Sequence, residues 1–172
     1  FGGAPRSAVG ALRTALASGD RTLVVASDLR VGLPTGPEDG GGGDAATAIL
    51  VGSDEDGPLL AEYLGGATAT AEFTDRWRTP GEAHSRTWEA RFGEQAYLPL
   101  AHRAWTDALE ATNLTAADVT VAAVAGLHSR ATKKAAAALG VAVAEDRTDT
   151  VGNAGAAHPS PLLADRKSTP LH

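Results

Sequence analysis

Apolar residues recur at three- and four-residue spacing along several stretches of the chain, which is the pattern of amphipathic helices. The clearest stretch covers residues 94–112 and places Tyr97, Leu100, Trp105 and Leu109 on one face. Further helices are predicted over residues 5–18, where Gly19 ends the pattern, over 129–140, where Ser129 provides a cap and Gly140 a stop, and over 153–164.

Short apolar runs between these helices predict β-strands. The runs at 22–27, 45–52 and 119–125 are apolar at consecutive positions, which is typical of strands buried on both faces. Residues 59–70 predict a more exposed strand, and 141–144 a brief one. Because strands and helices alternate, the sequence predicts an α/β layered fold with mostly parallel buried strands.

The order of elements repeats in outline along the chain. It predicts a first part over 1–73, a connecting excursion over 74–93, a second part over 94–165 and a tail over 166–172. The 172-residue sequence contains no Met and opens inside a helical pattern, so we expect it to be an incomplete form of its fold.

Composition excludes several classes of function. The net charge is -6, and the sequence contains no long run of Lys or Arg. Both observations argue against nucleic-acid binding. No apolar run approaches the roughly 20 residues that a bilayer requires, so no membrane association is expected. The sequence contains no Cys, which leaves cytoplasm as the default location, and no His/Asp/Glu cluster has the spacing of a metal site.

The stretch from Thr150 to His158 carries the strongest chemical signal. It places Asn153 between glycines and before small residues, so that one side-chain amide is presented where a backbone or ligand can approach closely. Such amides bind carbonyl oxygens and oxyanions. A turn alone is the simpler explanation, but the flanking glycines already supply the conformational freedom that a turn needs.

Four motifs in the same order resemble the thiolase superfamily, in the branch of ketoacyl-ACP synthase III and HMG-CoA synthase. They are a small-residue helix ending near Ser18-Gly19, the strand that ends in Val-Val-Ala-Ser-Asp28, the segment Gly43-Asp-Ala-Ala46 and the turn Gly152-Asn-Ala-Gly-Ala-Ala157. The resemblance covers residues 2–165. It implies a thiolase-like layered fold of two similar halves, no cofactor other than a CoA or acyl carrier protein thioester as substrate, a homodimer and, as in retro-aldolase relatives, an OB-fold partner protein.

The resemblance also implies which residues act. Members of this branch use a nucleophilic Cys at a helix N-terminus, whereas this chain has Gly2 near that position, and the first histidine of the family falls on Ala125. His128 lies where a small polar residue is usual. The implied catalytic residues are His128 and Asn153, with Tyr63 or Tyr97 as more remote candidates, and the implied substrate-binding residues are Gly2, Gly3, Gly152 and Gly155.

Three functions follow from the resemblance and stay open. The chain belongs to an acyltransferase whose Cys lies upstream, or to a retro-aldolase in which His128 is base or donor and Asn153 binds the thioester carbonyl. The third is a catalytically degenerate subunit that binds acyl-CoA or supports an active partner. Catalysis predicts that His128 and Asn153 converge, whereas Asp28, Asp44 and His158 are expected to be structural.

Overall fold

The computed structural model describes residues 1–2 and 4–168. The chain divides into two compact units. One consists of Phe1–Tyr63 together with Asp146–His172, and the other of Leu64–Glu145.

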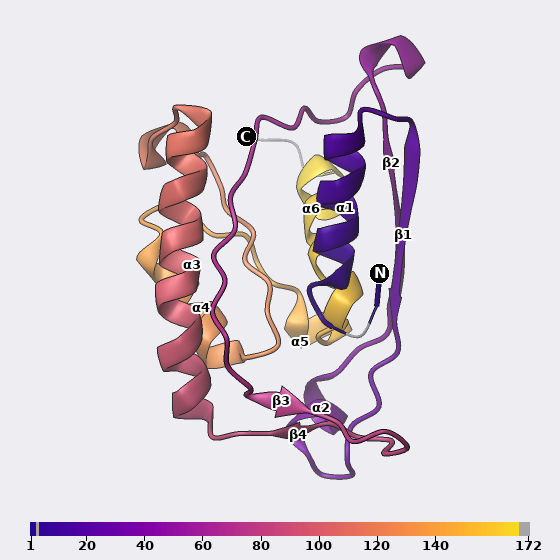
Figure 1. The fold of residues 1–172 in the computed structure, drawn as a ribbon, viewed down its shortest axis with the longest axis vertical. Helices are drawn as coiled ribbons and strands as arrows, with labels where there is room; N and C mark the ends of the chain where they lie inside the picture. Colours follow the sequence, from indigo (N-terminus) through magenta and orange to yellow (C-terminus); the bar gives the residue numbers. More distant parts are fainter. Residues whose placement is uncertain (3, 169–172) are drawn as a thin grey trace. The chain divides into compact units, whose positions relative to one another are not determined.

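A two-stranded sheet organises the first unit. Strand β1 (Thr22–Asp28) pairs antiparallel with β2 (Ala45–Val51), in a register that runs from Thr22↔Val51 to Asp28↔Ala45. Helix α1 (Ser7–Ser18) contacts β1 and helix α6 (Pro159–Ser168) contacts β2, both on the same face of the sheet (Figure 1). Helix α1 ends at Gly19, which adopts the left-handed φ of 73°. The predicted helix over 5–18 is therefore confirmed.

Burial alternates along both strands, which corrects the prediction of strands buried on both faces. Val24 and Ala26 are 8% exposed, whereas Leu23 and Val25 on the opposite face are 60% and 65% exposed. The helices cover one face, where a small core of Ala26, Ala154 and Ala157 lies. The consecutive apolar residues correctly indicated that both faces of the strands are apolar. Within the described residues, however, helices cover only one of these faces.

Both ladders in the described part of the chain are antiparallel, which corrects the prediction of mostly parallel strands. The connection from β1 to β2 contains the five-residue helix α2 (Pro37–Gly41) and returns the chain beside β1 without a crossover helix. In the second unit, β3 (Arg76–Trp77) and β4 (Arg86–Thr87) form a short antiparallel pair. Parallel pairing occurs at two isolated bridges, Gly42↔Asn153 and Ala122↔Val143.

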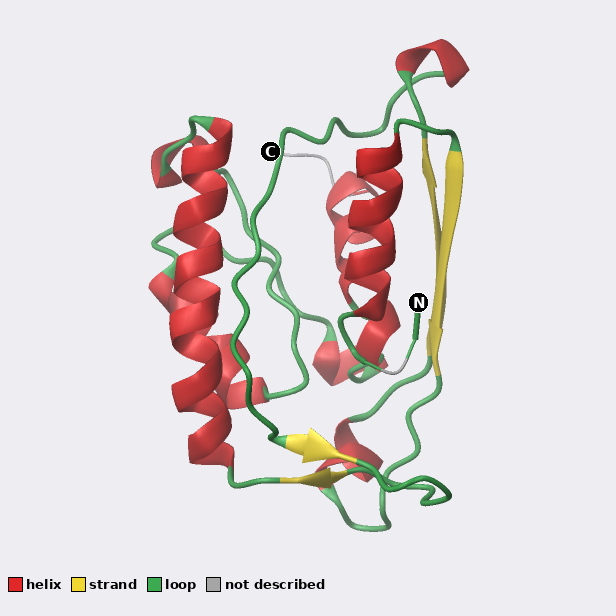
Figure 2. Ribbon diagram, in the orientation of Figure 1, coloured by secondary structure: helices red, strands yellow, loops and turns green. Residues whose placement is uncertain are grey.

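Two helices form the main packing of the second unit. Helix α3 (Ala90–Thr112) contacts α4 (Ser129–Ala138), as Figure 2 shows. The predicted helix over 94–112 is confirmed, with its start moved to Ala90. Next comes the 3-10 turn η2 (Ala116–Asp118), where Thr115 and Asp118 form a reciprocal capping box. The hydrogen bonds from the Thr115 hydroxyl and backbone amide lower the pKa of Asp118.

Three further predicted strands are reduced or absent. Residues 59–70, all of them described, form no strand and are mostly exposed. The runs at 119–125 and 141–144 meet at one parallel bridge, where the Ala122 amide donates to the Ala142 carbonyl at 2.9 Å. Their predicted pairing direction holds at that bridge, but their predicted length does not.

The predicted helix over 153–164 is divided. The chain instead forms α5 (Thr148–Val151), a 3-10 turn η3 (Gly155–Ala157) and α6, which continues to Ser168. Gly152 and Gly155 have φ values of 75° and 53°, which a right-handed helix cannot contain. A further 3-10 turn, η1 (Asp54–Asp56), follows β2. Among residues 1–2 and 4–168, no helix has the length and hydrophobicity needed to cross a membrane.

Candidate functional site

The turn at Gly152–Ala157 is held by close backbone contact with the loop that precedes β2. The backbone N–H of Asn153 donates to the Gly41 carbonyl at 2.8 Å, and the backbone N–H of Gly43 donates to the backbone carbonyl of Asn153 at 3.0 Å. A Cβ atom on Gly152 would overlap the carbonyl of Gly42. Glycine is therefore required at Gly152 both for its φ and for the approach of the two backbones.

A second set of contacts fixes the side chain of Asn153. Its Oδ1 accepts a hydrogen bond from the Gly155 amide at 2.9 Å, which is an Asx-type turn. From the end of β1, Asp28 Oδ2 accepts from the Ala156 amide at 2.8 Å. Because an amide oxygen only accepts, any hydrogen bond from this side chain to the oxygen of a ligand must be donated by Nδ2.

These contacts give the two glycines of the turn a structural role. A Cβ on Gly155 would overlap the carboxylate of Asp28, just as one on Gly152 would overlap Gly42. The expectation that Asp28 holds a strand end was correct, but its contact with Ala156, 128 residues away, was not foreseen. Binding of substrate by Gly152 and Gly155 stays a prediction.

His128 lies in the second unit, at the N-terminus of α4. Its Nδ1 accepts a hydrogen bond from the Ala131 amide at 3.1 Å, so His128, and not Ser129 as predicted, is the N-cap. The ring packs against α3, where a Cβ on Gly93 would lie 2.9 Å from Nε2, and its centroid is 6.5 Å from that of Tyr97. Since Nδ1 accepts, the proton of the neutral ring is on Nε2.

A buried carboxylate lies beside this histidine and was not among the predicted residues. Glu94 of α3 is 7% exposed and forms ion pairs with Arg130 at 2.8 Å and with Lys134, both from α4. The hydrogen bond from Lys134, together with the charges of Arg130 and Lys134, holds the pKa of Glu94 below its usual range, although burial acts in the opposite direction. His128 adds a smaller effect that also lowers this pKa.

Glu94 and the basic residues of α4 are 36 to 40 positions apart in the sequence, which hides this cluster from any local pattern. The available signal was a carboxylate on the inner face of a predicted helix and the basic residues Arg130 and Lys134 one turn apart on another. That signal indicates the pair of helices but does not identify their contact.

The remaining predicted residues are exposed, make other contacts or lie outside the described residues. Gly2 is exposed, and Gly3 lies outside the described residues. Tyr63 is 49% exposed, and the Tyr97 hydroxyl donates to Asp75 Oδ2 at 2.9 Å. Asp44 accepts from the Arg30 amide at 2.7 Å, in agreement with its expected structural role.

The two predicted catalytic residues belong to different units. Asn153 is part of the unit that contains the sheet of β1 and β2, and His128 is part of the unit that contains α3 and α4. Their convergence on one substrate therefore stays a prediction.

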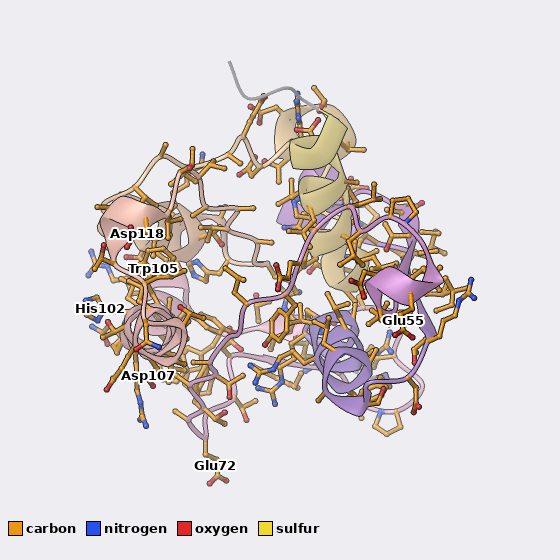
Figure 3. The ribbon with its side chains drawn as sticks, turned by 90° about the horizontal axis from the view of Figure 1, so that it is seen from above. Glu55, Glu72, His102, Trp105, Asp107 and Asp118 are labelled. Atoms are coloured by element: carbon orange, nitrogen blue, oxygen red, sulfur yellow. The ribbon has the colours of Figure 1, made fainter. Side chains whose placement is uncertain are left out.

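His102 and Asp107 project from α3 on the outer side of its own unit (Figure 3). The described residues contain no group of three or more His, Asp or Glu side chains arranged to bind a metal.

Comparison with known proteins identifies the fold. No protein-family model matches the chain, and no curated protein matches it. Among solved structures, it is similar to an HMG-CoA synthase complexed with CoA, with a TM-score of 0.68 and 16% sequence identity. The match covers 99% of this chain and 49% of the synthase chain, so the chain spans about half the length of that protein. The chain therefore has part of a thiolase-like α/β fold.

Proposed function

We propose that this chain is the thioester-binding part of an enzyme that makes or breaks a C–C bond beside the carbonyl of an acyl-CoA or acyl carrier protein thioester. The observation that carries the proposal is the Gly152–Asn153 turn, which is held rigidly through Gly41–Gly43 and Asp28. It occurs in a chain that aligns over 99% of its length with a synthase solved with CoA.

Asn153 is proposed to bind the thioester carbonyl oxygen. Its main chain is bridged to the neighbouring loop and its Oδ1 is held by Gly155, so the orientation of the amide is set before a substrate arrives. A donor that is already oriented stabilises the negative charge of an enolate or oxyanion without reorganisation during the reaction.

His128 is proposed to donate from Nε2 to an oxygen that gains charge. Accepting the Ala131 amide at Nδ1 fixes the Nε2–H tautomer. A role as base would require a free lone pair on Nε2 and therefore a proton on Nδ1, which would break the cap of α4. Of the two roles considered from the sequence, the local geometry favours donor over base.

The chemistry of the residues present favours reactions without a covalent acyl-enzyme on this chain. Acyl transfer in the manner of HMG-CoA synthase or ketoacyl synthase III requires a thiolate, and this sequence contains no Cys. Retro-aldol cleavage breaks the C–C bond as a base takes the proton of the 3-hydroxyl group, and hydrogen-bond donors stabilise the enolate that forms, which is the task proposed here for Asn153 and His128. The same lack of Cys supports a second candidate, the degenerate subunit, in its acyl-CoA-binding form.

Calorimetric titration of the intact chain with acetyl-CoA tests both candidates. We expect saturable binding that Asn153→Asp weakens, because aspartate keeps the Oδ1 acceptor for Gly155 but cannot donate. Asn113→Asp is the matched control, since Asn113 is the other Asn of the sequence and caps α3 in the second unit. Absence of acetyl-CoA binding would contradict both candidates.

Turnover separates the two candidates. With a 3-hydroxyacyl-CoA as substrate, the retro-aldolase releases a free aldehyde or ketone, and Asn153→Asp should lower kcat by roughly 10²–10³-fold, the usual effect of removing one oxyanion donor. Binding without turnover would favour the degenerate subunit. Incubation with a reactive acyl-CoA should leave the intact mass of the chain unchanged, because no cysteine is present to be acylated.

Homodimerisation and association with an OB-fold protein are proposals that come from the resemblance to the thiolase superfamily. Light scattering coupled to gel filtration would test the homodimer. A mass of one chain at all concentrations would argue against it. Co-purification with a candidate OB-fold protein, followed by the same mass measurement, would test the second association.

A further inference from the structure

A cavity of about 260 Å³ lies within the first unit, beside the Gly152–Ala157 turn. Its walls come from β2, α5 and α6 and are mainly apolar: Val151, Ala154, Pro161 and Leu162. Asn153 does not line the cavity, although both of its neighbours do. The cavity shares Gly152 with the proposed thioester site but does not include Asn153, and binding of a ligand here goes beyond the function proposed above.

One buried polar group lines this cavity without a partner. His158 is 4% exposed, and its Nε2 makes no hydrogen bond within the described residues. Its Nδ1 accepts a long hydrogen bond from the Ala154 amide at 3.4 Å, which places the proton of the neutral ring on Nε2. A buried N–H without an acceptor is unfavourable, and a ligand that supplies an acceptor would relieve that cost.

The two charged side chains that line the cavity, Arg147 and Asp165, neutralise each other. Arg147 donates to both carboxylate oxygens of Asp165, at 3.1 and 3.3 Å, so the cation is neutralised by a group that lines the same cavity. An anionic ligand would have to compete with Asp165 for Arg147 and would meet its negative charge. The site therefore favours a neutral molecule.

We propose that this cavity binds a small neutral molecule with a short apolar body and one carbonyl oxygen, which accepts a hydrogen bond from His158 Nε2. The volume lies below the roughly 300 Å³ at which pockets for drug-sized ligands begin, so the cavity suits a molecule smaller than these. The apolar body contacts Leu162 and Val151, and the carbonyl oxygen gives the buried imidazole the acceptor that the protein does not provide.

Three probes of similar shape test the chemistry on the intact wild-type chain. We would titrate ¹⁵N-histidine-labelled protein with 3-pentanone, with 2-ethyl-1-butene, in which the carbonyl is replaced by C=CH₂, and with propionate. The ketone should shift the Nε2 resonance of His158 saturably and bind about five- to tenfold more tightly than the alkene, the usual contribution of one hydrogen bond. Propionate should bind more weakly than the ketone.

Two variants assign the effect to the cavity. Leu162→Phe, which fills the apolar part of the cavity, should abolish ketone binding, whereas His102→Leu, which replaces an exposed histidine of the second unit, should leave it unchanged. Wild-type protein is the primary test, so a variant that fails to fold does not decide the outcome. Equal affinity for ketone and alkene, tighter binding of propionate, or a cavity that holds water alone at every probe concentration would overturn the proposal.

Discussion

Replacement of Asp28 by Ala tests whether the Gly-Asn turn is held by a contact from the end of β1. The carboxylate accepts from the Ala156 amide at 2.8 Å, and hydrogen bonds to charged groups contribute about 1.5–3 kcal/mol. Ala156 is half-buried, so water replaces part of the lost bond and the lower end of this range applies. We therefore expect a loss of about 1.5–2 kcal/mol in the free energy of unfolding.

Urea denaturation gives the measurement. With a slope near 2 kcal/mol per molar, the expected loss lowers the midpoint by roughly 0.8–1 M. Asp28→Asn keeps an acceptor oxygen and should lose less than Asp28→Ala. Asp20→Ala is the matched control in the same unit, because Asp20 is exposed and surface substitutions of this kind change stability by about 0.5 kcal/mol or less.

Amide hydrogen exchange adds a local measurement to the same experiment. If the carboxylate holds the turn, the Ala156 amide should exchange faster in Asp28→Ala than in the wild-type chain. Equal midpoints for Asp28→Ala and Asp20→Ala, with unchanged exchange at Ala156, would refute the idea that β1 anchors the turn.

Three further substitutions test other parts of the account. Gly152→Ala combines a strained left-handed φ with backbone overlap, so it should cost at least about 1–3 kcal/mol of unfolding free energy in urea and weaken acetyl-CoA binding; wild-type values would contradict this. Gly93→Ala should displace the His128 ring and remove the cap of α4, a loss of about 1 kcal/mol by thermal unfolding, with faster exchange of the α4 amides. The hydrogen bond from Lys134 holds the pKa of Glu94 below its ordinary value, so its stabilising contribution is complete above that ordinary value and is lost as the pH falls through the lowered pKa. Glu94→Gln should flatten this acid dependence, and an unchanged pH profile would argue against the ion pair with Lys134.

Local patterns predicted the elements whose signals lie within a few residues. The helix at α3 and the end of α1 at Gly19 both depend on spacing along the chain. The division of the predicted last helix was also visible in principle, since Gly155 lies within it and is a poor residue for a helix interior.

Contacts between distant segments could not be predicted in the same way. The apolar run of β1 indicated two apolar faces but not which of them the helices cover, and the direction of pairing with β2 depends on the path of the loop between them. The hydrogen bond between Asp28 and Ala156 joins residues 128 positions apart in the sequence. The ion pair between Glu94 and Lys134 joins residues 40 positions apart. In the sequence, Asp28 and Glu94 each fit an ordinary local role. Only the folded structure shows that Asp28 bonds the Gly152–Ala157 turn and that Glu94 pairs with α4.

The central claim is that the side-chain amide of Asn153 binds a thioester carbonyl, and NMR titration of the ¹⁵N-labelled chain tests it most directly. The sequence contains two Asn residues, so the Asn113 amide serves as an internal control. The account predicts that acetyl-CoA shifts the Nδ2 resonance of Asn153 saturably, that free CoA, which lacks the carbonyl, does not, and that Asn113 is unaffected by either. Binding of acetyl-CoA that leaves the Asn153 amide unshifted, or that shifts it no more than free CoA does, would contradict the account.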